Sequence, residues 1–238
     1  MQPSSRRYQI LSGSALKLIA VVSMLIDHFA SRLLAKSPIP LVSVGRHEFT
    51  LYDFRRFIGR AAFPIYCFLL VEGFLHTGSR KKYALNLLLF ALLSEIPWDL
   101  AHHGTVLYLR SQSVYVTLLL GFLGMCALER FRASPGRLLA VLGILFYGSI
   151  LLRCDYGCAG FALILLLYVL RDRKVEKTII GCGLLGCTYR APIGFLPILL
   201  YNGKRGFIQS RVVKYAFYAF YPVHMLILYF IMRRFGLI

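Results

Sequence analysis

The sequence predicts an all-α fold, a polytopic helical bundle embedded in a membrane, and three observations support this prediction. Of the 238 residues, 58% are hydrophobic and 16% are charged, whereas soluble domains average about 45–50% and about 25%. The mean hydropathy is +0.66. The apolar residues form repeated runs close to the ~20 residues that cross a bilayer as a helix. We expect one membrane-embedded domain over residues 1–238, with residues 1–14 as a cytoplasmic N-terminal tail.

Nine apolar runs are candidate membrane helices, within a range of eight to ten. In order, they cover residues 16–34, 57–77, 83–101, 113–130, 137–153, 156–171, 178–189, 191–201 and 212–232. The first run is no cleaved signal, because it contains Asp27 and His28 and lacks a small-residue cleavage site. The seventh and eighth runs are too short to span comfortably. They form either short tilted helices or a broken hairpin around Arg190, Pro192 and Pro197.

The distribution of Lys and Arg predicts the orientation. Three or four cations mark the N-terminus and the segments after the second, fourth, sixth and eighth runs, whereas the third, fifth and seventh are followed by one each. Cytoplasmic loops of membrane proteins are enriched in Lys and Arg, so we expect a membrane protein with a cytoplasmic N-terminus. The net charge of +18 then reflects basic loops facing anionic lipid or an anionic ligand, and we expect no nucleic-acid partner.

One loop departs from this alternation. Six cations lie between the first and second runs, on the side that should be poor in them: Arg32, Lys36, Arg46, Arg55, Arg56 and Arg60. Three explanations stay open at this stage: the loop folds into the protein, it serves an anion, or the topology differs.

The six cysteines lie in or beside apolar runs and form no CxxC pair, so we expect no metal site.

Ionisable residues inside the apolar runs are few, and such residues usually face a cavity or a partner and mark function. They are Asp27, His28, Glu72, His76, Glu95 and His224. His28, Glu95 and His224 each lie twelve positions beyond the cytoplasmic start of their run. At 1.5 Å per residue this places all three at a depth of about 18 Å. Glu72 and His76 share one helix side nearer the inner face.

A poorly hydrated histidine near a carboxylate can act as a general base near neutral pH. His28 is our candidate base. Its neighbour Asp27 points about 100° away on a helix, so Glu95 or Tyr221 is an equally plausible partner. The alternative interpretation is that these polar groups only hold helices together. His47, His102 and His103 are expected in solvated loops.

Two basic turns lie at the predicted inner face. One ends the second run and carries Arg80, Lys81 and Lys82. The other is Tyr201-Asn202-Gly203-Lys204-Arg205-Gly206. An Asn-Gly turn followed by cations presents backbone N–H groups and positive charge together, which suits a phosphate. A positive-inside loop with a turn would look the same.

These residues together resemble the TraX family of membrane proteins. The matching stretches, in family order, are Leu16-Lys17-Leu18-Ile19-Ala20 with Met24-Leu25-Ile26-Asp27-His28, Ile58-Gly59-Arg60-Ala61-Ala62-Phe63-Pro64-Ile65, Val71-Glu72-Gly73 with His76-Thr77, Leu93-Ser94-Glu95-Ile96-Pro97, Tyr201 to Gly206, and Lys214-Tyr215 through Phe220-Tyr221-Pro222-Val223-His224. Between about 105 and 200 the resemblance rests on hydropathy and on Asp155-Tyr156-Gly157.

The resemblance implies an integral-membrane acetyltransferase of the bacterial inner membrane that uses acetyl-CoA, as the named family member acetylates the N-terminus of a pilin. The family also resembles the wider group of multi-span membrane acyltransferases. The acceptor would be an amine or hydroxyl of a pilin-like protein, a glycan or a lipid. His28, Asp27 and Glu95 would be catalytic, and six residues would line the cavity: Arg60, Glu72, His76, Ser94, Tyr221 and His224. The CoA phosphates would meet Arg80, Lys81, Lys82, Asn202, Lys204 and Arg205.

Two other functions use the same residues differently. A proton-coupled transporter would use the buried carboxylates and histidines as a relay, with the broken seventh and eighth runs as its binding site. A non-catalytic assembly factor for a surface protein would be indifferent to His28.

Overall fold

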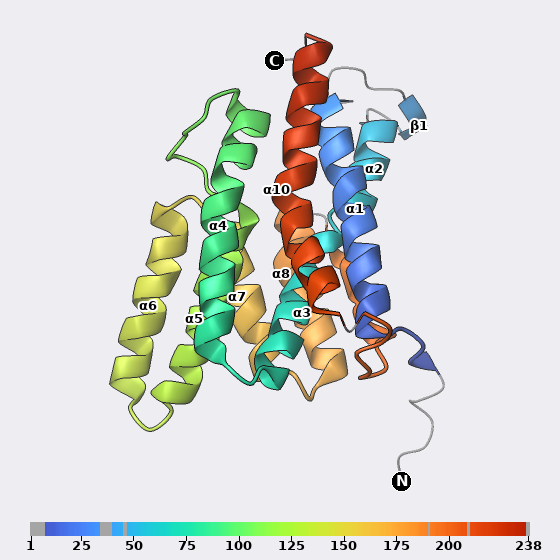
Figure 1. The fold of residues 1–238 in the computed structure, drawn as a ribbon. Coiled ribbons are helices and arrows are strands. Elements are labelled where there is room, and N and C mark those ends of the chain that lie inside the picture. The colour runs from blue at the N-terminus through green and yellow to red at the C-terminus, as the bar shows by residue number, and fades with distance from the viewer. Residues whose placement is uncertain (1–7, 34–39, 45–46, 190, 209, 237–238) are drawn as a thin grey trace.

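The computed structural model describes residues 8–33, 40–44, 47–189, 191–208 and 210–236, which fold into a bundle of α-helices (Figure 1). The helices are α1 (Gly13–Leu33), α2 (Leu51–Gly59), α3 (Ala62–His76), α4 (Arg80–His103), α5 (Val114–Arg130), α6 (Pro135–Leu151), α7 (Gly157–Val169), α8 (Lys174–Tyr189), α9 (Phe195–Leu199) and α10 (Arg211–Arg234). A 3₁₀ turn, η2 (Pro192–Gly194), precedes α9. Before α2 a short antiparallel hairpin joins β1 (Pro40–Val44) to β2 (His47–Thr50). The sequence did not predict this hairpin.

The predicted helical membrane bundle is confirmed. Among the residues that the structure describes, four helical segments are long and apolar enough to cross a membrane: Gly13–Leu33, Leu51–His76, Arg80–His103 and Val212–Arg234. α6 and α7 are shorter apolar helices. With α2 and α3 taken as one segment, the described residues contain nine helical segments, in the order that the apolar runs predicted.

Local side-chain chemistry sets several helix ends. At the start of α2 the Asp53 backbone N–H donates to Oγ1 of Thr50, and the Thr50 N–H donates back to the Asp53 carboxylate. This reciprocal cap satisfies two N–H groups that the helix leaves free. Ser79 caps α4 in a similar way, because the Lys82 N–H donates to its hydroxyl. α4 ends at Gly104, whose φ of 68° is favourable for glycine.

α8, η2 and α9 form a broken hairpin. α9 has five residues and is far too short to cross a bilayer by itself. Any Cβ added to Gly194 of η2 would collide with Pro64 and Ala61, which places η2 against the junction of α2 and α3. The chain then returns to Tyr201, which pairs with Leu11 just before α1. Of the two arrangements expected for the short runs, the described residues therefore follow the hairpin.

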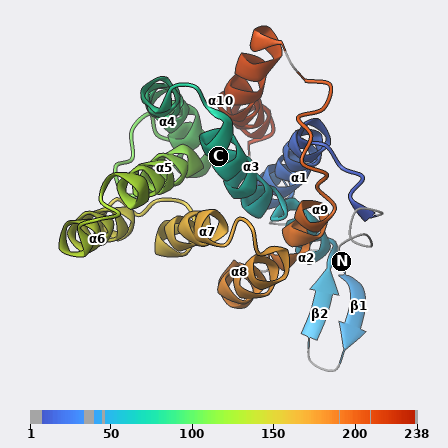
Figure 2. The same ribbon diagram turned by 90° about the horizontal axis from the view of Figure 1, so that it is seen from below.

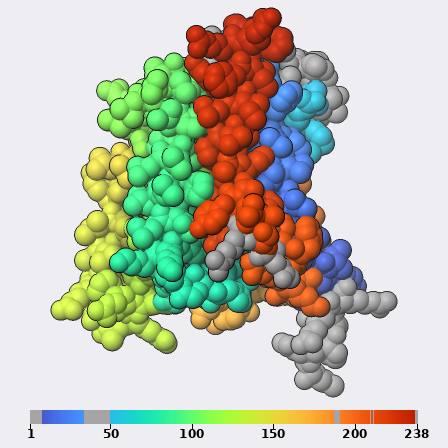
Figure 3. Space-filling view, in the orientation of Figure 1, coloured from blue at the N-terminus to red at the C-terminus, as the bar shows by residue number. Residues whose placement is uncertain are grey.

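The core centres on α3, which packs against α1, α5, α7 and α9 and lies among them in Figure 2. Nine side chains of α3 are buried. α6 contrasts with it, because Ser149 is the buried residue of that helix. Its apolar side chains Leu139, Ile144 and Leu151 are about 70% exposed. Such a surface suits lipid rather than water. α4 and α10 lie side by side on the face that Figure 3 shows.

The two ends of the bundle carry different segments (Figure 1). We call the end that holds the start of α1 the N-terminal face. The opposite end, where α10 finishes, is the C-terminal face. At the N-terminal face the segment before α1 is tied to the basic turn at 201–206. The N–H groups of Gly13 and Ser14 donate to the carbonyls of Lys204 and Arg205, and the Asn202 N–H donates to the carbonyl of Leu11.

Candidate functional site

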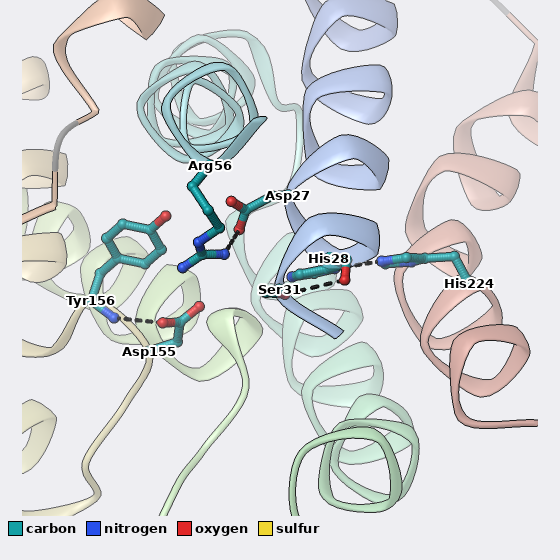
Figure 4. A network of polar contacts seen from close by, with 7 residues as sticks. All are labelled: Asp27, His28, Ser31, Arg56, Asp155, Tyr156 and His224. Carbon is teal, nitrogen blue, oxygen red and sulfur yellow. Dashed lines mark hydrogen bonds and ion pairs between the residues drawn. The ribbon is translucent and has the colours of Figure 1, made fainter. Parts of the chain in front are cut away.

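Two histidines from opposite ends of the chain meet in the interior. Nδ1 of His28 on α1 lies 2.7 Å from Nε2 of His224 on α10. The rings are nearly parallel, at 7°, with centroids 5.0 Å apart. With the nitrogens this close, the rings lie end to end in one plane (Figure 4). The similar depth predicted for His28 and His224 is therefore found.

The partners of His224 fix the proton positions in this pair. Nδ1 of His224 lies 2.8 Å from the carbonyl oxygen of Phe220. A carbonyl only accepts, so Nδ1 of His224 carries the proton. In the neutral ring Nε2 is then an acceptor, and His28 must donate from Nδ1. This leaves Nε2 of His28 with an unshared electron pair. The arrangement makes His28 the basic member and His224 the group that orients it.

Asp27 is bound by an arginine rather than by the neighbouring histidine. Nη1 of Arg56 on α2 donates to Oδ2 of Asp27 at 2.6 Å (Figure 4). The side chains are 21% and 12% exposed. The pair can form because α1 and α2 approach closely at this point. A Cβ added to Gly59 would collide with the backbone and the Cβ of Asp27. The basic loop therefore folds into the protein at Arg56.

A second carboxylate faces Asp27 from the connection between α6 and α7. The Tyr156 N–H donates to Oδ1 of Asp155 at 3.1 Å. Tyr156 has a φ of 61°, and its ring stacks on Phe63 with centroids 3.6 Å apart. Removal from water raises the pKa of Asp155 to about 6, and the negative charge of Asp27 acts in the same direction. Figure 4 shows Arg56 reaching in between these two carboxylates.

These side chains surround a small cavity of about 40 Å³. Its lining includes Asp27, His28, Asp155, Tyr156 and Tyr221. Oδ1 of Asp27 is buried and has no hydrogen-bond partner among the described residues. A buried carboxylate oxygen without a donor is costly, so this atom indicates that the cavity receives a hydrogen-bond donor. The volume suits one or a few water-sized groups.

Glu95 lies on α4, and its hydrogen-bond partner is Ser113 rather than His28, the partner considered from the sequence. Its Oε1 accepts hydrogen bonds from the N–H of Ser113 at 3.1 Å and from the Ser113 hydroxyl at 2.7 Å. It therefore secures the start of α5 and does not orient His28. Its neighbour Ser94 is buried, and the Ser94 hydroxyl has no partner among the described residues.

Two residues expected in the cavity lie elsewhere. The Glu72 carboxylate accepts a hydrogen bond from the Tyr201 hydroxyl at 3.0 Å, close to the N-terminal face. His76 is exposed, and its Nδ1 contacts the carbonyl oxygen of Glu72. The two positions share a helix side as predicted, but α3 ends at His76, so this side chain is beyond the packed interior. Arg60 lies close enough to Asp27 and Asp155 for its positive charge to interact with both carboxyl groups.

His102 was expected in a loop but belongs to the last turn of α4. Its ring stacks on Trp98 at 3.5 Å and lies 6.4 Å from His28 between centroids. The apolar pattern ends at residue 101, so the last two helical residues gave no hydropathy signal.

Arg56 and Asp155 were likewise not singled out for the site. The surplus of cations between residues 32 and 60 and the Asp155-Tyr156-Gly157 stretch were the signals available.

The basic residues expected to bind phosphate divide into two groups at the N-terminal face. Arg80 forms a two-bond ion pair with the carboxylate of Glu129, and its guanidinium lies 4.4 Å from the centre of the Phe74 ring. Arg80 is therefore occupied within the protein. Lys81 and Lys82 are exposed.

The second group surrounds the turn at 201–206. The Asn202 side chain accepts from the N–H of Lys204 at 2.9 Å, which shapes the turn. Lys204 and Arg205 are exposed. Lys17 lies close enough to Arg205 and to Lys214 for their charges to interact. These four side chains, Lys17, Lys204, Arg205 and Lys214, make up what we call the basic cluster.

The fold and the site define a polytopic helical membrane protein with a partly buried histidine pair beside two carboxylates. The chain belongs to the TraX family, since the family model described as "TraX protein" matches residues 12–232. It is also 28% identical, over 246 aligned positions, to the probable fimbrial assembly protein FimC, serogroup H1, of Dichelobacter nodosus, covering 91% of this chain and 94% of that one. No solved structure matches the chain. The resemblance to the TraX family is thus confirmed.

Proposed function

We propose that this chain is an integral-membrane acetyltransferase that moves an acetyl group from acetyl-CoA to an amine or hydroxyl of a pilin-like protein. The observation that supports it most is the in-plane contact of His28 with His224 beside a cavity that contains an unsatisfied oxygen of Asp27. A general base and an acceptor for a donating N–H or O–H then stand in one cavity. Acyl transfer to a nucleophile needs both.

His28 would accept the proton that the acceptor loses during attack, at Nε2. His224 is the positioning residue, because its Nε2 accepts the Nδ1 proton of His28 and fixes the ring. Asp27 would accept a hydrogen bond from the incoming N–H or O–H through Oδ1, while Arg56 holds Oδ2. Asp155 adds a second negative charge beside the cavity.

The basic cluster fits the phosphates of acetyl-CoA. Lys17 lies near Arg205 and Lys214, and Lys204 precedes Arg205 in the turn. Cations beside backbone N–H groups suit phosphate. Acetyl-CoA would supply an activated acetyl group and a thiol that takes up a proton. Lys81 and Lys82 remain candidates for the same role, whereas Arg80 is engaged by Glu129.

The pilin-like acceptor is supported by the comparisons. The D. nodosus relative is described as a fimbrial assembly protein. We further propose that the N-terminal face is cytoplasmic and that the membrane is the bacterial inner membrane. The Lys and Arg residues gather at the segments of that face, and cytoplasmic loops carry such an excess.

The first experiment is titration calorimetry of the detergent-purified protein with acetyl-CoA. We expect micromolar binding that a Lys204→Ala/Arg205→Ala variant weakens at least tenfold. An Arg132→Ala/Arg137→Ala variant is the matched control, because it removes two exposed cations of the N-terminal face, one in the α5–α6 connection and one in the first turn of α6. Absence of binding at millimolar acetyl-CoA, with a folded protein, would contradict the donor assignment.

The description of the relative also favours a second function, a non-catalytic assembly factor. The two functions differ in their dependence on His28. Transfer of labelled acetyl from acetyl-CoA to a pilin-like protein in proteoliposomes should disappear in His28→Asn. An assembly factor would support pilus formation in cells equally well with His28→Asn, and no acetyl label would reach the pilin.

A further inference from the structure

A second hollow of the molecule lies on its lipid-facing side, away from the basic cluster. It is a groove of about 620 Å³, within the range of about 300–1,000 Å³ typical of small-molecule sites. α1, α2 and α10 form its walls. Its lining includes Leu25 and Phe29 of α1, Phe54, Arg55 and Ile58 of α2, and Leu228 of α10. α2 lies in the half of the bundle nearer the C-terminal face (Figure 1), so the groove beside it lies in that half.

The groove and the catalytic cavity share a wall. Ile26 and Ile58 line the groove, whereas their chain neighbours Asp27 and Gly59 line the cavity. The contact of Gly59 with Asp27 therefore separates two spaces that face in different directions. A ligand in the groove touches the helices that carry Asp27 and Arg56 without entering the cavity.

Arg55 is the charged residue of this apolar lining. It forms no ion pair or hydrogen bond within the described part of the chain. The carboxylates of this region are engaged: Asp27 binds Arg56, and Asp53 accepts hydrogen bonds from Thr50. A guanidinium in an apolar membrane groove is costly without a counter-charge.

The local charge balance favours an anionic ligand. Among the side chains that the structure describes around this end of α1 and α2, four arginines (Arg32, Arg55, Arg56 and Arg60) meet three carboxylates (Asp27, Asp53 and Asp155). Arg32 and Arg56 lie close enough for their charges to repel. This excess lies on the face where the other loops are poor in cations. An apolar transmembrane helix would fill the groove but would leave Arg55 uncompensated.

We propose that the groove binds an anionic phospholipid, with its acyl chains along Leu25, Phe29 and Leu228 and its phosphate at Arg55. The apolar walls match the chains, and a guanidinium binds a phosphate through charge-assisted hydrogen bonds. The bound lipid lies against α1 and α2 and supports the contact that keeps Asp27 and Arg56 together. This inference is independent of acetyl transfer.

The test is tryptophan quenching by brominated lipids in reconstituted protein. The variant Phe54→Trp carries a groove reporter, and the variant Leu139→Trp carries a surface reporter on α6, where Leu139 is 71% exposed. Trp98, the single tryptophan of the chain, is common to both variants, and its quenching is measured in the unsubstituted protein. Brominated phosphatidylglycerol is compared with brominated phosphatidylcholine of the same chains.

We expect the groove reporter to prefer phosphatidylglycerol about fivefold, which corresponds to one basic residue near an anionic lipid, and the surface reporter to show no preference. Arg55→Gln should abolish the preference, whereas the control Arg110→Gln, which changes an exposed loop cation, should leave it intact. Equal quenching of the groove reporter by both lipids would overturn the proposal. If neither lipid quenches the groove reporter, the lipid proposal would be overturned and the groove would be occupied by a protein segment instead. If Phe54→Trp fails to fold, Phe29→Trp provides the same measurement.

Discussion

The ring nitrogens of His28 and His224 lie 2.7 Å apart although the residues are 196 positions apart in the chain. The orienting partner of the candidate base is therefore a neutral imidazole, held by the carbonyl of Phe220, and not a carboxylate. A neutral partner fixes the tautomer of His28 without adding a charge between two apolar helices. Two predictions about activity depend on this pair.

The first concerns His28. Its replacement by Asn should lower acetyl transfer by about 10²–10⁴-fold, the contribution of a positioned general base. Initial rates with labelled acetyl-CoA provide the measurement. His103→Asn is the matched control, because His103 is exposed at the end of α4, and it should retain the parent rate. Parent-like turnover in His28→Asn would refute the assignment.

The second concerns the positioning role of His224. His224→Gln keeps an oxygen that can accept the Nδ1 proton of His28, whereas His224→Leu removes the acceptor. We expect His224→Gln to retain at least tenfold more activity than His224→Leu at equal thermal stability. A purely structural role would give variants whose activities follow their stabilities and show no such rescue.

Gly59 provides a prediction about packing. A Cβ at this position collides with Asp27, so Gly59→Ala should force α1 and α2 apart and lower the free energy of unfolding by about 3 kcal/mol. Gly143→Ala is the control, since a Cβ there meets nothing within 4 Å. That variant should gain up to about 1 kcal/mol, because alanine is the better helix former. Equal unfolding midpoints in detergent would contradict the tight contact.

The ion pair of Asp27 with Arg56 predicts that substitutions of the two residues have non-additive effects on the free energy of unfolding. Arg56→Gln leaves a largely buried carboxylate without its partner and should cost about 2–3 kcal/mol of unfolding free energy, given that both side chains retain some exposure. The double variant Asp27→Asn/Arg56→Gln removes both charges and should be more stable than Arg56→Gln alone. A double-mutant cycle of chemical unfolding tests this, and additive losses would mean that the two groups do not interact.

The raised pKa of Asp155 predicts how the stability of the protein changes with pH. Its pKa is raised from 3.8 to about 6 in the folded protein, so the folded state holds a proton that the unfolded state has already lost. The stabilisation from this group is complete below about pH 4 and is lost as the pH rises through about 6. Asp155→Asn should therefore flatten the decline of the unfolding midpoint between these values. An unchanged slope would show that Asp155 titrates normally.

The sequence predicted the helices because a bilayer imposes a simple rule on their composition and length. It also predicted that His28 and His224 lie at a similar depth, because depth follows from counting residues along a helix, but it did not name His224 as the partner of His28. Counting gives no rotation about the helix axis, and Glu95 illustrates the consequence. It reaches a comparable position along α4, but its carboxylate turns to Ser113. Arg56 and Asp155 were missed as partners of the site because their approach to Asp27 depends on how α2 and a loop pack in three dimensions.

The hydrogen bonds between the start of α1 and the basic turn have a further consequence. Ser14 is joined to Arg205, and α1 runs without interruption from there to His28. Fourteen residues of helix set this separation at about 21 Å. The helix thus fixes the distance between the turn and the histidine, and under the proposed function a donor held by its phosphates at Arg205 would need an arm of matching reach. A shorter acetyl thioester could not contact Arg205 and His28 at the same time.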